Sequence, residues 1–305
     1  GGFGGVFDLA SLAGIDDPLM VASTDGVGTK TKLTAAMDLW EGAGGDIVNH
    51  GINDVLVQGA VPLFFLDTVA AQRLDPEIVG RIVDGMAEAC RASNCILLGG
   101  ETAEMPGVFT DGAVDIAGTM VGAVSRSKLL PKAGIEAGHV LIGVASSGLH
   151  TNGYSLARKV VGDTPLTDPL PGGNGESIGA ALCATHRSYH GVLASVIEQD
   201  LLMAMAHITG GGMQDNLPRV LPEHVGAVVD VSAWQRPALF DWLIQGAELG
   251  IEDAHQIFNC GIGMVLIVAA DDVASVQASI DEATWVIGET VAYDGSSARV
   301  QLVNI

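Results

Sequence analysis

The sequence lacks an apolar run of the length that a membrane span requires. Its longest apolar runs have about the length of a β-strand and are interrupted by glycine or charge, whereas a helix needs roughly 20 apolar residues to cross a bilayer. No signal-peptide pattern is visible at the start of the chain. We therefore expect a globular protein that does not bind membranes.

Basic residues are also scarce. The 14 lysines and arginines face 36 acidic residues, which gives a formal net charge of −22. A field of this sign repels nucleic acid and anionic membranes, so no nucleic-acid partner is expected. An anionic ligand would need a local device, such as a bound cation, a helix N-terminus or a nearby lysine.

Cysteines are few and scattered. The four are Cys90, Cys95, Cys183 and Cys260. Cys90 and Cys95 form a C-x4-C spacing with no second pair and no histidine cluster, which argues against a zinc site. Buried free thiols in a reducing compartment are the better interpretation, and we expect a cytoplasmic protein.

What the chain does contain is an alternation of strand-length apolar runs and helix-period segments, which predicts an α/β (mixed α+β) fold. The expected strands read PLMVAST, VPLFFLDTVAA, CILLGGET (ending in its glycines), VDIAGTMVGAV, VLIGVA, LLMAMAHI, AVVDV, GMVLIVAA, TWVIGETV and ARVQLV. The expected helices read DIVNHGINDVLVQG, DPEIVGRIVDGMAEACRASN, YSLARKVV, two segments after PLPGGNGES, PALFDWLIQGAELG and DDVASVQASIDEA.

The length of 305 residues suggests two domains. The turn-rich stretch SRSKLLPKAGIEAGH is the candidate boundary. We therefore predict an N-terminal domain over 1–126 and a C-terminal domain over 136–305, built on a similar plan.

The stretch STDGVGTK, residues 23–30, has the composition of a phosphate-binding loop. Glycines let backbone N–H groups approach an oxyanion closely, and Lys30 adds a positive donor. Asp25 suits this setting only if a Mg²⁺ ion lies between its carboxylate and the phosphate. A turn capped by its own aspartate and threonines is the alternative.

Further carboxylates follow apolar runs at predicted element ends. Asp54 lies in a helix beside Asn53, Asp67 follows the apolar PLFFL, and Glu101 and Thr102 follow the glycines of LLGGET. Side chains from different strand ends can converge, which favours a shared magnesium site over separate solvated carboxylates.

In the second half, two glycine-rich stretches carry histidines. SSGLHTNG contains His150 and Asn152, and HITGGGMQDN contains His207 and a glycine triplet. Three consecutive glycines are costly in backbone entropy, and such a run fits a backbone that wraps an anion. A flexible loop remains the alternative for the triplet, and a capping or surface role the alternative for His150.

Together, STDGVGTK, NDVLVQGAVPLFFLD, LLGGETAEMPG, SSGLHTNGYSL, HITGGGMQDNLPRVLP and FNCGIGM resemble, in order, the motifs of the aminoimidazole ribonucleotide synthetase (phosphoribosylformylglycinamidine cyclo-ligase) family. The resemblance implies an ATP-dependent ligase of purine biosynthesis. Such an enzyme converts formylglycinamidine ribonucleotide and ATP to aminoimidazole ribonucleotide, ADP and phosphate. It also implies two α/β domains and a homodimer in which N-terminal-domain strands form a barrel.

The resemblance also implies roles for particular residues. It implies that the Mg²⁺–ATP ligands are Asp25, Asp54 and Glu101. Catalytic roles fall to His150, His207 and Asp54. The implied nucleotide contacts are Thr24, Asp25, Gly26, Gly28, Thr29, Lys30, Asn53, Asp67 and Thr102. The implied substrate contacts are Asn152, Thr209, Gly210, Gly211, Gly212 and Asn216.

Two other interpretations compete with the cyclo-ligase. One is a different ATP-using enzyme of the same superfamily, such as a thiamine-phosphate kinase or formylglycinamidine ribonucleotide synthetase. The other is a non-enzymatic nucleotide-binding or scaffold protein that kept the fold. Intact carboxylates at positions 25, 54 and 101 argue against the second.

Overall fold

A computed structural model of the chain describes residues 4–305, which divide into two compact units. Among the described residues, unit 1 comprises 4–129 and Leu182–His190, and unit 2 comprises Leu130–Ala181 and Gly191–Ile305. The border at Leu129 falls inside the predicted linker. The structure differs from the expected C-terminal domain in one respect, because Leu182–His190 belongs to unit 1.

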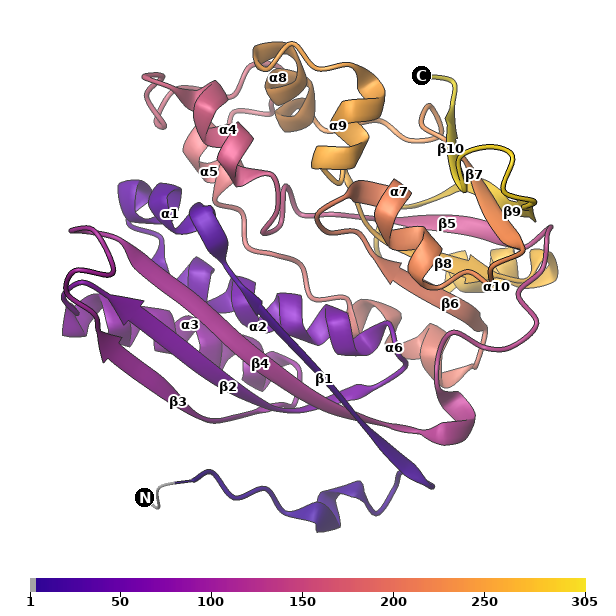
Figure 1. Ribbon diagram of the computed structural model, residues 1–305, viewed down its shortest axis with the longest axis horizontal. Helices are drawn as coiled ribbons and strands as arrows, with labels where there is room; N and C mark the ends of the chain where they lie inside the picture. Colours follow the sequence, from indigo (N-terminus) through magenta and orange to yellow (C-terminus); the bar gives the residue numbers. More distant parts are fainter. Residues whose placement is uncertain (1–3) are drawn as a thin grey trace. The chain divides into compact units, whose positions relative to one another are not determined.

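Unit 1 is a four-stranded sheet with helices on one face. Its strands are β1 (Pro18–Gly26), β2 (Val61–Ala71), β3 (Ile96–Glu104) and β4 (Val114–Ser125), and its helices are α1 (Thr31–Met37), α2 (Trp40–Leu56) and α3 (Pro76–Ala92). The sheet order is β1-β4-β2-β3, with β2 and β3 parallel and the other pairs antiparallel. Figure 1 shows α2 and α3 together on one side of this sheet.

Local sequence explains the position of α3. The side chain of Asp75 caps the helix by accepting a hydrogen bond from the Glu77 amide, and Pro76 occupies the first turn, as the sequence predicted. Ile82, Met86 and Cys90 are buried on one face. These side chains join the core of unit 1, together with Ile52 and Val55 of α2 and Phe65 of β2.

The third strand runs further than the sequence suggested. The expected strand ended in its glycines, whereas β3 continues through Gly99 and Gly100 to Glu104, in parallel register with β2. Hydrogen bonding to a neighbouring strand holds these glycines extended. The residues that follow them therefore lie inside a strand and not in a loop.

Unit 2 is built on a six-stranded sheet of order β10-β7-β9-β5-β8-β6. Its strands are β5 (Val140–Ala145), β6 (Leu202–His207), β7 (Val225–Asp230), β8 (Ile262–Val268), β9 (Thr284–Ala292) and β10 (Val300–Val303). All seven residues of β8 are buried, and a strand buried on both faces has a continuous apolar sequence.

The later helices follow the predictions with two omissions. They are α4 (Tyr154–Val161), α5 (Ile178–Leu182), α6 (His190–Glu198), α7 (Gly212–Asn216), α8 (Ala238–Gly246), α9 (Ile251–Ile257) and α10 (Val273–Ala278). The sequence pattern predicted neither α7 nor α9, because helices of five and seven residues carry too short an apolar pattern. None of the helices within residues 4–305 has the length and apolar composition needed to cross a membrane.

Short 3-10 turns complete the two units. They are Leu9–Leu12, Gly28–Lys30, Arg126–Lys128, Leu217–Arg219 and Ala270–Asp272.

Candidate active site

A cluster of polar side chains joins β1 to α2 in unit 1. The Ser23 hydroxyl donates a hydrogen bond to Oδ2 of Asp54 over 2.7 Å. Nε2 of His50 lies 3.1 Å from Oδ2 of Asp25 and 3.5 Å from Oδ2 of Asp54. We call Ser23, Asp25, His50 and Asp54 the carboxylate cluster. Asp25 and Asp54, which are far apart in the sequence, therefore both lie against His50.

The electrostatics of this cluster favour a positive charge between the two carboxylates. Burial alone would lower the pKa of His50, but hydrogen bonds to Asp25 and Asp54 outweigh it and raise that pKa to about 9. The hydrogen bond from His50 lowers the pKa of Asp25. The protonated His50 ring therefore occupies a position where two carboxylates stabilise a cation. Carboxylate oxygens are also hard ligands of the kind that Mg²⁺ prefers.

Sequence reasoning missed His50, although a signal for it was present. His50 and Asp54 are four residues apart in one helix, so their side chains lie on the same face. Asp25 reaches that face because side chains alternate along β1. Ser23, two residues earlier, lies on the same side.

The structure does not bring Glu101 and Thr102 to this cluster. Both are exposed residues of β3, at the opposite edge of the sheet from β1. Glu101 is in register with Thr68 of β2, whose neighbour Asp67 faces the helices, so Glu101 lies on the face away from them. The prediction that Glu101 joins Asp25 and Asp54 as a third ligand is therefore not supported within one chain.

Asp67 lies in the middle of β2 and not at its end. It and Asp25 are both in register with Gly118 of β4, so one strand separates them by roughly 10 Å on the helix-facing side. Burial raises the pKa of Asp67. Gly100 lies directly against its carboxylate, where a Cβ atom would overlap it.

The rest of the stretch 23–30 is more regular than a loop. Residues up to Gly26 belong to β1, and Gly28 opens a 3-10 turn with a φ of +64°. The hydroxyl of Thr24 lies 2.7 Å from that of Thr119. Thr29 is exposed, and the Gly26 amide donates a hydrogen bond to Asp25.

Lys30 and Asn53 have different partners from those predicted. The ammonium group of Lys30 is buried and lies 2.8 Å from Oδ2 of Asp46, and it also donates a hydrogen bond to the carbonyl oxygen of Ala184. Asn53 is fully buried and its carboxamide binds residues 186–189. Both side chains are buried and make these contacts within unit 1.

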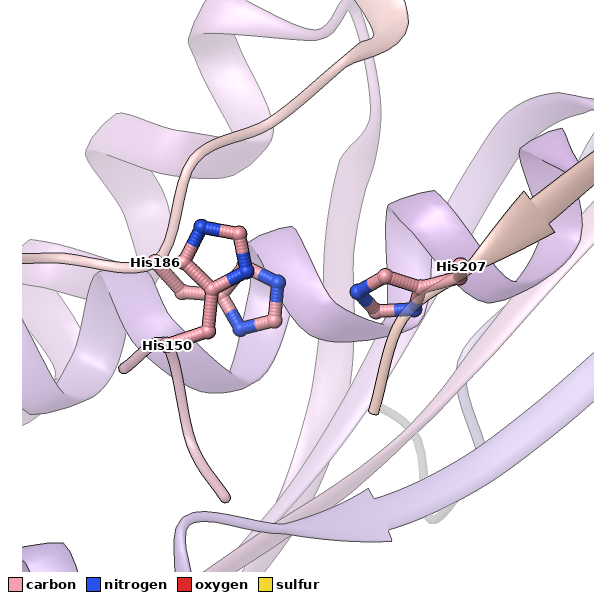
Figure 2. Close-up of side chains that lie close together, drawn as sticks. All are labelled: His150, His186 and His207. Carbon is pink, nitrogen blue, oxygen red and sulfur yellow. The ribbon is translucent and has the colours of Figure 1, made fainter. Parts of the chain in front are cut away.

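Both predicted site histidines belong to unit 2. His150 follows β5 with a φ of +63°, and its Nε2 accepts a hydrogen bond from the Ser147 amide. His207 is the last residue of β6. One ring nitrogen of His150 and one of His207 lie within 4.8 Å of each other. Figure 2 draws the rings of His150 and His207.

The glycine triplet forms a tight turn between β6 and α7. Gly211 and Gly212 have φ values of +89° and +61°, and a Cβ atom on Gly212 would overlap the carbonyl oxygen of His255. The side-chain amide of Asn216 donates hydrogen bonds to the carbonyl oxygens of Gly210 and Gly212. Glycine is therefore required at 211 and 212 by the positive φ values, and at 212 also by the close approach of α9.

The turn leaves backbone donors available. Within residues 4–305, the amide N–H groups of Gly210 and Gly211 donate no hydrogen bond. The Thr209 hydroxyl binds Asn216, and Nδ2 of Asn152 would lie 3.5 Å from a Cβ atom on Gly210. The substrate residues predicted from the sequence are therefore neighbours in unit 2, although the carboxylate of Asp215 also lies against Gly211.

His255 is a second histidine that sequence reasoning missed. It is buried, its ring meets that of Trp234 edge-on at 5.8 Å between centroids, and its Nε2 has no hydrogen-bond partner within residues 4–305. Burial, with a smaller contribution from Arg236, lowers its pKa to about 4. At neutral pH the His255 ring of α9, the helix that packs on the glycine turn, is therefore uncharged.

Comparison with solved structures first defines the fold class. The hydrogenase maturation protein HypE of E. coli superposes with a TM-score of 0.69 at 19% identity, covering 98% of this chain and 87% of that one. Thiamine-monophosphate kinase from Stenotrophomonas maltophilia gives a TM-score of 0.66 at 19% identity, covering 94% and 86%. T. maritima PurL complexed with AMPPCP gives 0.62 at 14%, covering 95% and 43%. At these identities the likeness shows the fold alone.

The sequence then defines the family. Residues 8–124 match the N-terminal domain, and residues 136–301 the C-terminal domain, of AIR synthase related protein. The chain belongs to this family. It is also 43% identical over 311 residues to the bifunctional purine biosynthetic protein ADE1 of Schizosaccharomyces pombe, covering 100% of this chain but only 39% of that protein.

Proposed function

We propose that this chain is an ATP-dependent cyclo-ligase that closes the ring of formylglycinamidine ribonucleotide to give aminoimidazole ribonucleotide, ADP and phosphate. The observation that carries the proposal is the meeting of Asp25 and Asp54 around His50, in a chain of the AIR synthase related family. The likeness to the purine biosynthetic protein ADE1 along the whole chain supports the same pathway.

Asp25 and Asp54 are the proposed magnesium ligands. When bound there, Mg²⁺ would offset the charge of the ATP phosphates beside the two carboxylates. The Ser23 hydroxyl orients the carboxylate of Asp54 through its hydrogen bond. Glu101 is left out of this set because it faces the other side of the sheet.

The residues of unit 2 are proposed to serve the substrate. The amides of Gly210 and Gly211 would donate to a phosphate group, as glycine turns do elsewhere. Asn216 keeps that turn closed by binding its carbonyl oxygens. His150 and His207 are the proposed groups that move the proton released on ring closure, a task that suits an imidazole near neutral pH.

Substitution of Asp54 tests the magnesium site. Asp54→Asn should lower kcat for Mg²⁺-dependent ADP release by at least about 10²-fold, because an amide cannot replace the charge that a metal ligand supplies. Asp84→Asn, an equal change of charge at an exposed position of α3, is the matched control. Activity within twofold of wild type in the Asp54 variant would remove Asp54 from the site.

Substrate choice separates this proposal from its nearest alternative. A coupled assay of ADP release should respond to formylglycinamidine ribonucleotide and not to thiamine phosphate. The opposite result would assign the chain to the kinase branch of the fold. ADP release that requires formylglycinamide ribonucleotide and glutamine would assign it to the synthetase branch instead.

We also propose that a second copy of the chain covers the face of the unit 1 sheet away from its helices. That face exposes apolar side chains from three of its four strands, namely Met20 of β1 (55% exposed), Leu66 of β2 (37%) and Ile96 of β3 (50%). Burying them in a dimer would remove this apolar surface from water. Sedimentation should give a dimer at micromolar concentration, and a monomer would overturn the pairing.

A further inference from the structure

A stripe of polar side chains on α2 binds a segment that comes from much later in the chain. Asp46, Asn49 and Asn53 are spaced so that they lie on one face of the helix. All three form hydrogen bonds with residues 186–189. We call residues 184–189, which belong to unit 1, the clasped segment.

The clasped segment is held mainly through its backbone. The His186 amide donates to Oδ1 of Asp46 over 2.7 Å, and the His186 carbonyl oxygen accepts from Nδ2 of Asn49 over 2.7 Å. Lys30, paired with Asp46, donates to the carbonyl oxygen of Ala184 over 2.7 Å. Two of these hydrogen bonds involve the backbone of His186 itself, and they hold its Cα atom against α2.

The orientation of the Asn53 carboxamide is decided by two backbone groups. Its Oδ1 accepts a hydrogen bond from the Tyr189 amide over 2.8 Å, and its Nδ2 donates one to the carbonyl oxygen of Arg187 over 2.7 Å. Exchanging the two atoms would place two donors face to face and two acceptors face to face. The nitrogen of Asn53 is therefore the atom that faces Arg187.

That orientation determines the protonation of the neighbouring ring. The same Nδ2 lies 3.1 Å from Nε2 of His186. Because Nδ2 is a donor only, Nε2 must accept, so the proton of the His186 ring is on Nδ1. A ring held in this way offers an Nδ1–H donor and cannot take a proton at Nε2 without breaking the bond to Asn53.

His186 also adjoins the carboxylate cluster. Its ring centroid lies 5.2 Å from that of His50, at an interplanar angle of 61°. Both rings belong to unit 1, and His50 contacts Asp25 and Asp54. The clasped segment therefore adds a neutral, oriented histidine beside the proposed magnesium ligands.

We infer that Asn53 is a positioning residue: its carboxamide fastens the clasped segment to α2 and fixes His186 as the Nδ1–H tautomer beside the carboxylate cluster. This role explains why an asparagine next to Asp54 is fully buried and makes no approach to ligand-accessible surface. Only the expected effect of this positioning on turnover rests on the proposed function.

The tautomer can be measured directly in the full-length chain. With ¹⁵N-histidine labelling, the ring-nitrogen shifts of His186, identified by their loss in His186→Gln, should show a protonated Nδ1 and an unprotonated Nε2. In Asn53→Asp the donor to Nε2 becomes an acceptor, so Nε2 of His186 should become protonated. Asn49→Ala removes a hydrogen bond to the same histidine without touching its ring, and should leave the tautomer unchanged.

The wild-type spectrum decides the inference even if a variant fails to fold. A protonated Nε2 in the wild-type chain would overturn it. The same tautomer in wild type and in a folded Asn53→Asp variant would also overturn it, because groups other than Asn53 would then determine the tautomer of His186.

Turnover gives a second, separable result. Asn53→Ala should lower kcat about tenfold through loss of orientation, with KM for ATP changed by less than about twofold, and its kcat should fall further than that of Asn49→Ala. Equal losses of kcat and of melting temperature in the two variants would indicate a structural role and overturn the inference. If the chain shows no turnover with formylglycinamidine ribonucleotide, the proposed function fails, and the spectra still test the position of the proton.

Discussion

The two units build their candidate sites by opposite means. Unit 1 uses charge: two carboxylates surround a buried histidine whose pKa is raised to about 9, and a lysine is buried against Asp46. Unit 2 uses backbone: a glycine turn with two positive φ values is closed by Asn216 and packed against His255, whose pKa is lowered to about 4. The two proposed phosphate sites would thus rely on side-chain charge in unit 1 and on neutral amides in unit 2.

The difference has a physical reason in a chain of net charge −22. Where Asp25 and Asp54 meet, a cation between them offsets the mutual repulsion of their carboxylates. Where a turn offers backbone N–H groups, no added charge is needed. Substitutions should therefore act through electrostatics in unit 1 and through backbone geometry in unit 2.

The largest expected effect comes from removing the buried cation of unit 1. Lys30→Met would leave the carboxylate of Asp46, which is fully buried, without its ammonium partner. Breaking such a pair costs about 3–5 kcal/mol, which denaturant unfolding would measure. Lys32→Met, at an exposed position of α1, should change stability by less than about 0.5 kcal/mol.

A double variant sharpens this test. Lys30→Met with Asp46→Leu removes both charges and should recover part of the loss, because no charge is then left buried. If Lys30→Met alone proves as stable as wild type, the Lys30–Asp46 ion pair does not stabilise unit 1, and the account of unit 1 based on charge is wrong.

The next largest effect tests whether the turn in unit 2 depends on its backbone conformation. Gly212→Ala puts a Cβ atom onto the carbonyl oxygen of His255 at a φ of +61°, and should destabilise the protein by about 2–3 kcal/mol. Gly210→Ala is the matched control, since its nearest neighbour would be Nδ2 of Asn152 at 3.5 Å, an ordinary contact. Similar losses of stability in both variants would contradict the requirement for glycine at 212.

The smallest effect is a pH dependence that arises from His255. Its pKa is about 4 in the folded chain, against 6.5 for an unperturbed histidine, so between these values the unfolded chain binds more protons. Stability therefore rises as pH rises through this window and is lost as pH falls, by about 2 kcal/mol at pH 5 from this residue.

Urea unfolding at pH 5 and pH 8 would measure this slope. His255→Gln should reduce the difference between the two pH values, whereas His224→Gln, at an exposed position, should leave it unchanged. An undiminished slope in the His255 variant would mean that other groups carry the acid sensitivity.

The sequence alone predicted most of the fold. Strand-length apolar runs such as those of β2 and β8 and the capped helix α3 were visible as local patterns, because strands and helices impose periods of two and 3.6 on side-chain burial. Asp25 and Asp54 were identified as partners from chemistry and from resemblance. The parts that failed were those where a neighbour overrides local preference, as β2 does when it holds Gly99 and Gly100 in β3.

The residues themselves determined the alternation of elements, the acidic character, the family and the chemical types of the candidate groups, since each depends on composition or on short-range pattern. Only the tertiary structure decided which groups meet. It turned Glu101 to the far face of the sheet, buried Lys30 on Asp46, and brought residues 184–189 onto α2, more than a hundred positions from Asn53. Such pairings depend on strand register and chain path, which no local pattern encodes.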